Sequence, residues 1–181
     1  MLAAATLMSA GPVAGAGLDT KVLEVHVENH AHVTASVLER AEKLAAEIYA
    51  AAGVRIVWVD GDEVSRPVAA FHVRVILLSR DMSEALAKAD GIADDVLGEA
   101  RRPLGRAWVL CSRLMDVSGD KQIFTADLLG KVIAHEIGHL LSAGHSTRGI
   151  MQASFRRYQY GPQEFTAEQA VSVRASLETR R

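Results

Sequence analysis

KVIAHEIGHLLSAGH, residues 131–145, is the stretch of the chain that decides its interpretation. Apolar residues return in its first part at spacings of three and four, which is typical of a helix. His135 and His139 lie four positions apart in that pattern, so their side chains project from one face of the helix. Both imidazoles can therefore offer a nitrogen atom to one metal ion, and Glu136 lies beside them.

A third histidine follows the helical pattern. His145 lies six positions beyond His139, after the segment 142–144, which is a plausible helix end and turn. Catalytic zinc takes three protein ligands and leaves one position open for water. We therefore predict that His135, His139 and His145 bind one zinc ion and that Glu136 lies next to it.

The composition favours a metal site made of histidines. Cys111 is the single cysteine, which excludes an intrachain disulfide and a four-cysteine zinc site. The formal net charge of -2 leaves no basic excess, so we expect no nucleic-acid partner. A length of 181 residues with 49% hydrophobic residues fits one packed domain.

The rest of the chain predicts an α+β protein. Runs rich in β-branched residues predict strands over 22–27, 54–59, 71–78 and 106–114. Helical spacing predicts helices over 33–53 and 125–141, and a capping box at Thr166–Gln169 predicts a last helix towards Glu178. Residues 80–105 contain several glycines, and we expect loops there around one short strand near Ile92. The later strands have too few helices between them for a doubly wound sheet.

The histidine motif resembles that of the metzincin clan of zinc metallopeptidases. HEIGHLLSAGH (135–145), followed by GIM (149–151), is similar to the clan's HExxHxxGxxH motif and its later methionine turn, and Ser146 is similar to the matrixin pattern. The resemblance implies a zincin fold with a twisted mixed sheet, two long helices, a turn at Met151 and a C-terminal helix. It also implies that His135, His139 and His145 are the zinc ligands and that Glu136 is the general base.

One position departs from the metzincin motif. The clan has glycine where this chain has Ser142, because the backbone leaves the helix there at an angle that costs other residues free energy. Either Ser142 adopts that strained conformation, or the turn moves to Gly144. Both versions keep the ligand spacing.

The site predicts a zinc-dependent endopeptidase. Zinc bound by three neutral imidazoles lowers the pKa of its bound water, and Glu136 would activate that water for attack on a peptide bond. The resemblance implies that a peptide or protein substrate lies antiparallel to an edge strand, for which Gly91–Val96 is our candidate.

Two alternatives remain open at the level of sequence. In the first, Glu164 or Glu168 replaces His145 as the third ligand, as in zincins with a downstream glutamate. In the second, the chain is a metal-binding interaction module that does not cleave peptides. The presence of Glu136 argues against the second, because a silent site has no chemical use for this carboxylate.

The N-terminal segment predicts export. Residues 1–18 carry no charge and end in small residues, which resembles a secretory signal, so we expect a catalytic domain over 19–181 in a secreted, periplasmic or other extracytoplasmic location. No second apolar run of that length follows, so we expect no stable membrane span. Nothing in the sequence indicates an oligomer, and we expect a monomer.

A few other residues have weaker functional interpretations. Tyr158 and Tyr160 follow the methionine and are either packing residues or an extra metal ligand or oxyanion donor. His30 and His32 are expected in a turn rather than in a second metal site. Cys111 is expected to be buried within a strand.

Overall fold

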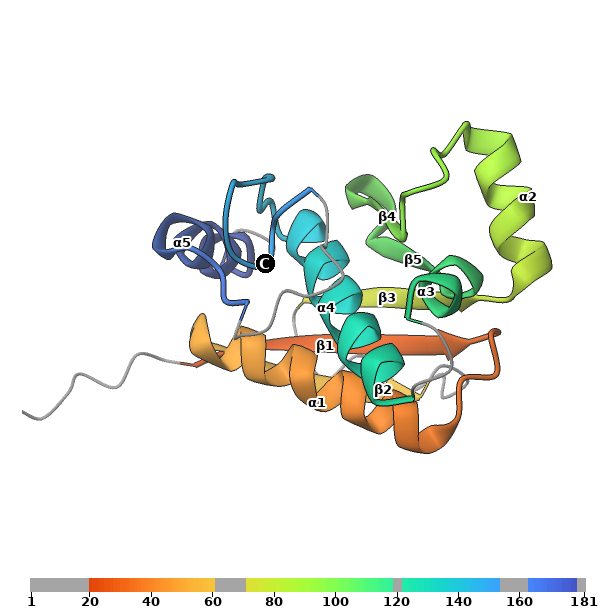
Figure 1. Ribbon diagram of the computed structural model, residues 1–181. Coiled ribbons are helices and arrows are strands. Elements are labelled where there is room, and N and C mark those ends of the chain that lie inside the picture. The colour runs from red at the N-terminus through yellow and green to blue at the C-terminus, as the bar shows by residue number, and fades with distance from the viewer. Residues whose placement is uncertain (1–19, 61–70, 119–121, 154–162, 179–181) are drawn as a thin grey trace, which may run out of the picture.

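The structure, a computed structural model, describes residues 20–60, 71–118, 122–153 and 163–178 (Figure 1). Within these residues, one five-stranded sheet has the order β2-β1-β3-β5-β4. Its strands are β1 (Lys21–Asn29), β2 (Val54–Asp60), β3 (His72–Leu78), β4 (Gly98–Arg101) and β5 (Arg106–Leu110). All neighbouring strands are parallel except β4, which is antiparallel to β5 at the edge of the sheet. The predicted α+β class with a mixed sheet is confirmed.

Two long helices, α1 (Ala35–Ala51) and α4 (Gln122–Leu140), pack together over the sheet (Figure 1). Alternate side chains of a strand point to one face of the sheet, and in β1 Leu23 and Val25 are fully buried. The two helices lie in close contact at Gly130, where an added Cβ would lie 2.6 Å from the carbonyl oxygen of Ala41. Glycine at this position therefore lets the predicted histidine helix lie directly against α1.

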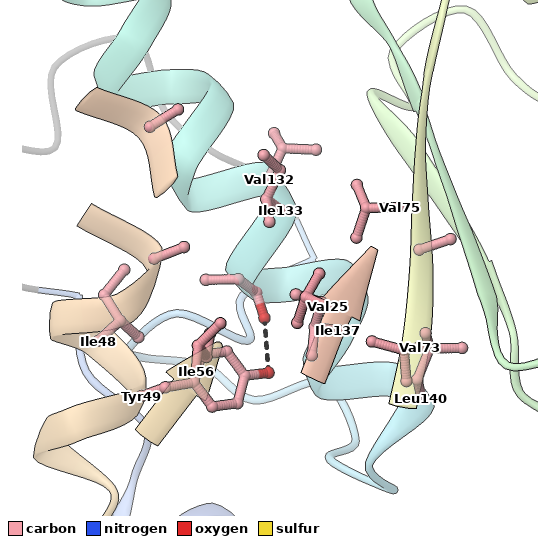
Figure 2. Close-up of a cluster of buried hydrophobic side chains, with 14 of the residues drawn as sticks. Val25, Ile48, Tyr49, Ile56, Val73, Val75, Val132, Ile133, Ile137 and Leu140 are labelled. Atoms are coloured by element: carbon pink, nitrogen blue, oxygen red, sulfur yellow. Dashed lines mark hydrogen bonds between the residues drawn. The ribbon is translucent and has the colours of Figure 1, made fainter. Parts of the chain in front are cut away.

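A buried tyrosine links α1 to α4 (Figure 2). The Tyr49 hydroxyl donates a hydrogen bond of 3.1 Å to the carbonyl oxygen of Ala134, the residue before His135. The Tyr49 ring also meets Phe165 edge to face, with the ring centroids 5.0 Å apart. Burial raises the pKa of Tyr49 well above its usual value, so the hydroxyl remains a donor. These contacts connect α1, α4 and the C-terminal segment.

The expectation of loops after β3 is wrong, because a helix, α2 (Arg80–Asp90), follows directly. The Ser79 side chain accepts a hydrogen bond from the N–H of Met82 at its start, and Gly91 ends it with a left-handed φ of 66°. Ser83 is the only buried residue of α2, so the helix lies at the surface, but Met82, Leu86 and Ala89 still return at helical spacing. That spacing and the capping residues were the signals that could have revealed the helix.

The edge strand and the end of β5 also differ from expectation. The strand of this region is β4, six residues beyond Ile92, and a short 3-10 helix (Arg102–Leu104) connects it to β5. β5 ends at Leu110, and the residues that we expected to continue it to position 114 begin a helix, α3 (Cys111–Ser118). Cys111 is buried as predicted, but in that helix, and burial raises the pKa of its thiol to about 12.

The C-terminal helix, α5 (Ala167–Ser176), begins as predicted. Thr166 accepts a hydrogen bond from the N–H of Gln169, and the Gln169 side chain accepts one from the N–H of Thr166, which completes a capping box. None of the helices in the described parts of the chain is both long and apolar enough to cross a membrane. The proposed export segment, residues 1–18, lies outside the described residues.

Candidate metal centre

The three predicted ligands converge on one point. His135 and His139 lie one turn apart on α4, with their Nε2 atoms 3.0 Å apart, and the Nε2 atom of His145 lies 3.1 Å from that of His139. One nitrogen from each ring lies within 4.8 Å of the other two, and no further group of three potential ligands occurs among the described residues. In tetrahedral zinc sites with Zn–N bonds of about 2.0–2.1 Å, the ligand nitrogens are about 3.3 Å apart. The triad fits a zinc ion.

Backbone carbonyls orient the two histidines of α4. The Nδ1–H of His135 donates to the carbonyl oxygen of Ile150 over 2.8 Å, and that of His139 donates to Ala143 over 3.1 Å. A carbonyl can only accept, so Nδ1 carries the proton and Nε2 is the nitrogen available to a metal. Burial lowers the pKa of His135 to about 4 and also lowers that of His139. Both rings are therefore neutral at pH 7, as metal binding requires.

The turn after α4 shows how the chain accommodates serine in place of glycine. The N–H of Ser142 donates to His139 over 3.2 Å, and the N–H of Ala143 donates to Gly138 over 2.9 Å, which is the Schellman pattern of a helix end. Ser142 itself adopts the left-handed conformation, with φ 69°, whereas Gly144 has no positive φ. The turn therefore stays at the position of the metzincin glycine.

The C-terminal helix offers Ser142 a hydrogen-bond partner. Its Oγ atom lies 2.9 Å from that of Ser176, and the Ser176 hydroxyl donates to the carbonyl oxygen of Leu141 over 2.8 Å. Because each hydroxyl has one proton, Ser142 donates to Ser176. This bond offsets part of the free-energy cost of the left-handed backbone.

We expect substitutions of Ser142 to separate these two effects. Ser142→Ala keeps the left-handed strain but loses the hydrogen bond, so the free energy of unfolding should fall by about 1 kcal/mol. Ser142→Gly loses the same bond but removes a strain of about 1 kcal/mol, so it should unfold close to the wild type. Urea unfolding of the metal-free proteins measures both. Equal stability of the alanine and glycine variants would contradict the strain at this position.

The turn that follows packs against the histidine helix. Met151 is fully buried, and an added Cβ at Gly138 would lie 2.6 Å from its sulfur atom. Gly149 has a left-handed φ of 76°, and an added Cβ there would collide with the carbonyl oxygen of Glu164. The backbone of this turn also supplies the Ile150 carbonyl that orients His135. Its two ends therefore lie against both α4 and the segment before α5.

The side chain of Glu136, a residue of α4, lies against the edge strand β4. Its side chain is 5% exposed, and an added Cβ at Gly98 of β4 would lie 2.7 Å from its Cγ and Oε1 atoms. Burial raises the pKa of Glu136 to about 8, and the nearby negative charge of Glu99 adds to this effect. Gly98 lies within residues 80–105, where the glycines of the sequence predict loops. The missing side chain at Gly98 leaves room for the Glu136 carboxyl, and this contact depends on tertiary packing.

Two arginines fix the segment that leads into β4. Arg113 of α3 donates to the carbonyl oxygens of Ala93 and Val96, the latter over 2.9 Å. Arg101 donates to Glu99 over 2.8 Å and to Asp90 at the end of α2. Residues 91–96, our candidate for the edge strand, are therefore an anchored connection, and the edge strand is Gly98–Arg101.

The alternative ligands do not join the histidines. Glu164 and Glu168 have exposed side chains and are not part of the group that can bind a metal ion. His30 lies in the turn after β1, 3.5 Å from Glu28, and His32 follows with a positive φ of 53°, which agrees with the turn interpretation. Tyr158 and Tyr160 lie outside the described residues.

An open pocket of about 490 Å³ lies beside the third ligand. The loop 144–148, which includes His145, forms one wall, and residues 166–169 and Ser172 of the C-terminal segment form the other. His145 is accordingly exposed, whereas His135 is buried. The third ligand therefore has less side-chain packing around it than the first.

Two solved structures of similar fold are a zinc-dependent peptidase and an archaemetzincin. A zinc-dependent peptidase from Methanocorpusculum labreanum matches with a TM-score of 0.60 at 15% sequence identity, over 83% of this chain and 99% of that one. Archaemetzincin from Methanopyrus kandleri matches with a TM-score of 0.58 at 14% identity, over 88% of this chain and 97% of that one. No family model and no curated protein sequence matches the chain. At these identities the likeness shows that this chain shares the fold of the two proteins.

Proposed function

We propose that the protein is a zinc-dependent endopeptidase of the metzincin type. The observation that carries this proposal is the convergence of three histidine Nε2 atoms. That of His139 lies 3.0 Å from that of His135 and 3.1 Å from that of His145, and the buried Glu136 is next to His135. The printed descriptions of the two similar structures, a zinc-dependent peptidase and an archaemetzincin, support it.

The chain's own residues provide the ligands and their orientation. Zinc, when bound by three neutral imidazoles, supplies a Lewis acid that activates water and polarises a carbonyl group. The Ile150 and Ala143 carbonyls fix the two rings of α4 so that Nε2 faces the metal position. The close packing of Met151 against Gly138 supports a methionine turn of the metzincin type at this position.

Glu136 is the proposed general base. Its carboxylate accepts a proton from the water that attacks the peptide carbonyl carbon, and it transfers that proton to the amine nitrogen when the C–N bond breaks. Burial raises its pKa to about 8 in the absence of a metal, and a neighbouring dication would favour the ionised, proton-accepting form. The space at Gly98 keeps the carboxyl at the edge strand, where a substrate would pass.

We propose that the substrate peptide pairs with β4. This strand is the last of the sheet and has one neighbour, β5, among the described residues. Pairing between backbones is tolerant of side-chain sequence and requires an extended segment, which an unfolded protein or a loop provides. Such binding suits cleavage within a chain rather than at its end.

The location of the protein is also a proposal. The uncharged residues 1–18 support export, so we propose that the protein acts outside the cytoplasm. We also propose that it acts as a monomer.

Removal of the metal tests the proposed activity. We expect the purified full chain to bind one zinc ion and to cleave an unfolded, casein-like protein. A strong chelator should abolish cleavage, and stoichiometric zinc should restore it, because the three histidines are then reoccupied. Metal analysis and gel electrophoresis of the cleaved substrate measure the two properties.

Two results would contradict the proposal in different ways. A chain that binds zinc but cleaves none of a panel of unfolded proteins would favour the silent metal-binding module. Cleavage that persists after complete removal of the metal would show that the histidine site is not responsible for it.

A further inference from the structure

The three candidate ligands are held in place by different means. The rings of His135 and His139 donate to backbone carbonyls over 2.8 and 3.1 Å. His145 lies beyond the helix, is exposed, and its Nδ1 atom has no hydrogen-bond partner among the described residues. The position of its ring therefore depends on the backbone of the loop that carries it.

That loop has one side-chain anchor at its centre. Its ends are fixed by backbone hydrogen bonds, in which the N–H groups of Ala143 and Ser146 donate over 2.9 Å. Between them, Gly144 has open space around it, since an added Cβ would meet nothing within 4 Å. Its carbonyl oxygen accepts a hydrogen bond of 2.9 Å from Nε2 of Gln169, twenty-five residues further along the chain. The anchored carbonyl belongs to the residue directly before His145.

Gln169 is itself fixed in orientation. Its side chain is part of a residue that is 8% exposed, and its Oε1 atom accepts the N–H of Thr166 over 3.0 Å in the capping box. Because Oε1 must face an N–H group, Nε2 must face a carbonyl, and the Gly144 oxygen is that partner. Both ends of the amide are therefore used. An ionised glutamate could serve only the first contact, and methionine neither.

We propose that Gln169 is a positioning residue for the third zinc ligand. Its amide connects the start of α5 to the Gly144 carbonyl and so keeps His145 within reach of the nitrogens of α4. An open pocket lies between this loop and the start of α5, and no other hydrogen bond joins residues 144–148 to residues 166–172 among the described residues. The inference rests on the proposed zinc site but not on peptide hydrolysis.

Zinc affinity of the full chain tests this inference. We would measure the zinc dissociation constant by competition with a chelator, and the Tm of each metal-free protein, for the wild type, Gln169→Met and Gln169→Glu. Methionine removes both hydrogen bonds without adding charge, and glutamate keeps the acceptor for the N–H of Thr166. We expect both variants to bind zinc about tenfold or more weakly, which is the range for lost partners of ligand-bearing groups.

Thr166→Ala is the matched control, because it breaks the same capping box from its other end. It should lower the Tm of the metal-free protein, yet leave the Gln169 amide to orient the loop, so zinc affinity should stay within twofold of the wild type.

The outcomes separate this inference from the metal site on which it rests. Zinc affinities of both Gln169 variants within twofold of the wild type would overturn it. So would a Thr166→Ala protein that binds zinc as weakly as they do, because the effect would then belong to the stability of α5. A wild-type chain without zinc affinity would overturn the metal site itself.

Discussion

Replacement of Glu136 by glutamine is expected to lower kcat/KM for cleavage of an unfolded protein by about 10²- to 10⁴-fold, the usual contribution of a general base. The amide has nearly the same shape, so it still fits the space opposite Gly98, but it cannot accept the proton. The zinc content should not change, since Glu136 is not one of the three residues that can bind the metal. Rates with a fluorogenic unfolded substrate and metal analysis on the same samples measure both effects.

Glu84→Gln is the control for this prediction. Glu84 is an exposed residue of α2, which is not part of the histidine site. Glu84→Gln likewise replaces a carboxylate by an amide, and the activity of this variant should match that of the wild type. If Glu136→Gln retains more than about a tenth of the activity with zinc bound, another group accepts the proton and the proposed mechanism is wrong.

The convergence of the three histidines could be predicted because its signals are local. Helix geometry alone places His135 and His139 on one face, and zinc chemistry requires a third ligand nearby. The structure brings the Nε2 atom of His145 to 3.1 Å from that of His139, as the spacing predicts. Even the strained turn at Ser142 could be stated as one of two alternatives, because a helix end has few possible backbone solutions.

The edge strand could not be predicted in the same way. β4 has four residues, too few for a pattern of alternation, and it exists through its pairing with β5. Gly98 carries no signal of its own in the sequence, since the reason for glycine is the carboxyl of Glu136, which lies 38 positions away in the chain. Contacts of this kind depend on how helices and sheet pack.

Gln169, in the capping box at Thr166, has one contact that the sequence predicts and one that it does not. The sequence predicts that Gln169 caps α5, and the structure confirms it. The other end of the same amide bonds to Gly144, and no local pattern indicates that contact. A residue with a sufficient local explanation can therefore have a second, tertiary role that sequence reasoning does not reveal.

His145→Ala is expected to weaken zinc binding by on the order of 10³-fold, because catalytic zinc needs three protein ligands and the described residues offer no replacement at the site. The chain should still fold, since His145 is exposed and lies in the loop after α4. Chelator competition measures the affinity, and circular dichroism of the metal-free protein verifies the fold. Peptide cleavage should be lost at zinc concentrations that saturate the wild type.

His30→Ala is the matched control for His145→Ala, because His30 is a half-exposed histidine in a turn that is not part of the triad, and its zinc affinity should equal that of the wild type. Full zinc affinity in His145→Ala would reject the three-histidine site. The next variants would then be Glu164→Ala and Glu168→Ala, since loss of zinc in one of them would identify a downstream glutamate as the third ligand. Either result follows from the same affinity measurement, because the two ligand sets share His135 and His139 and differ only in which residue completes them.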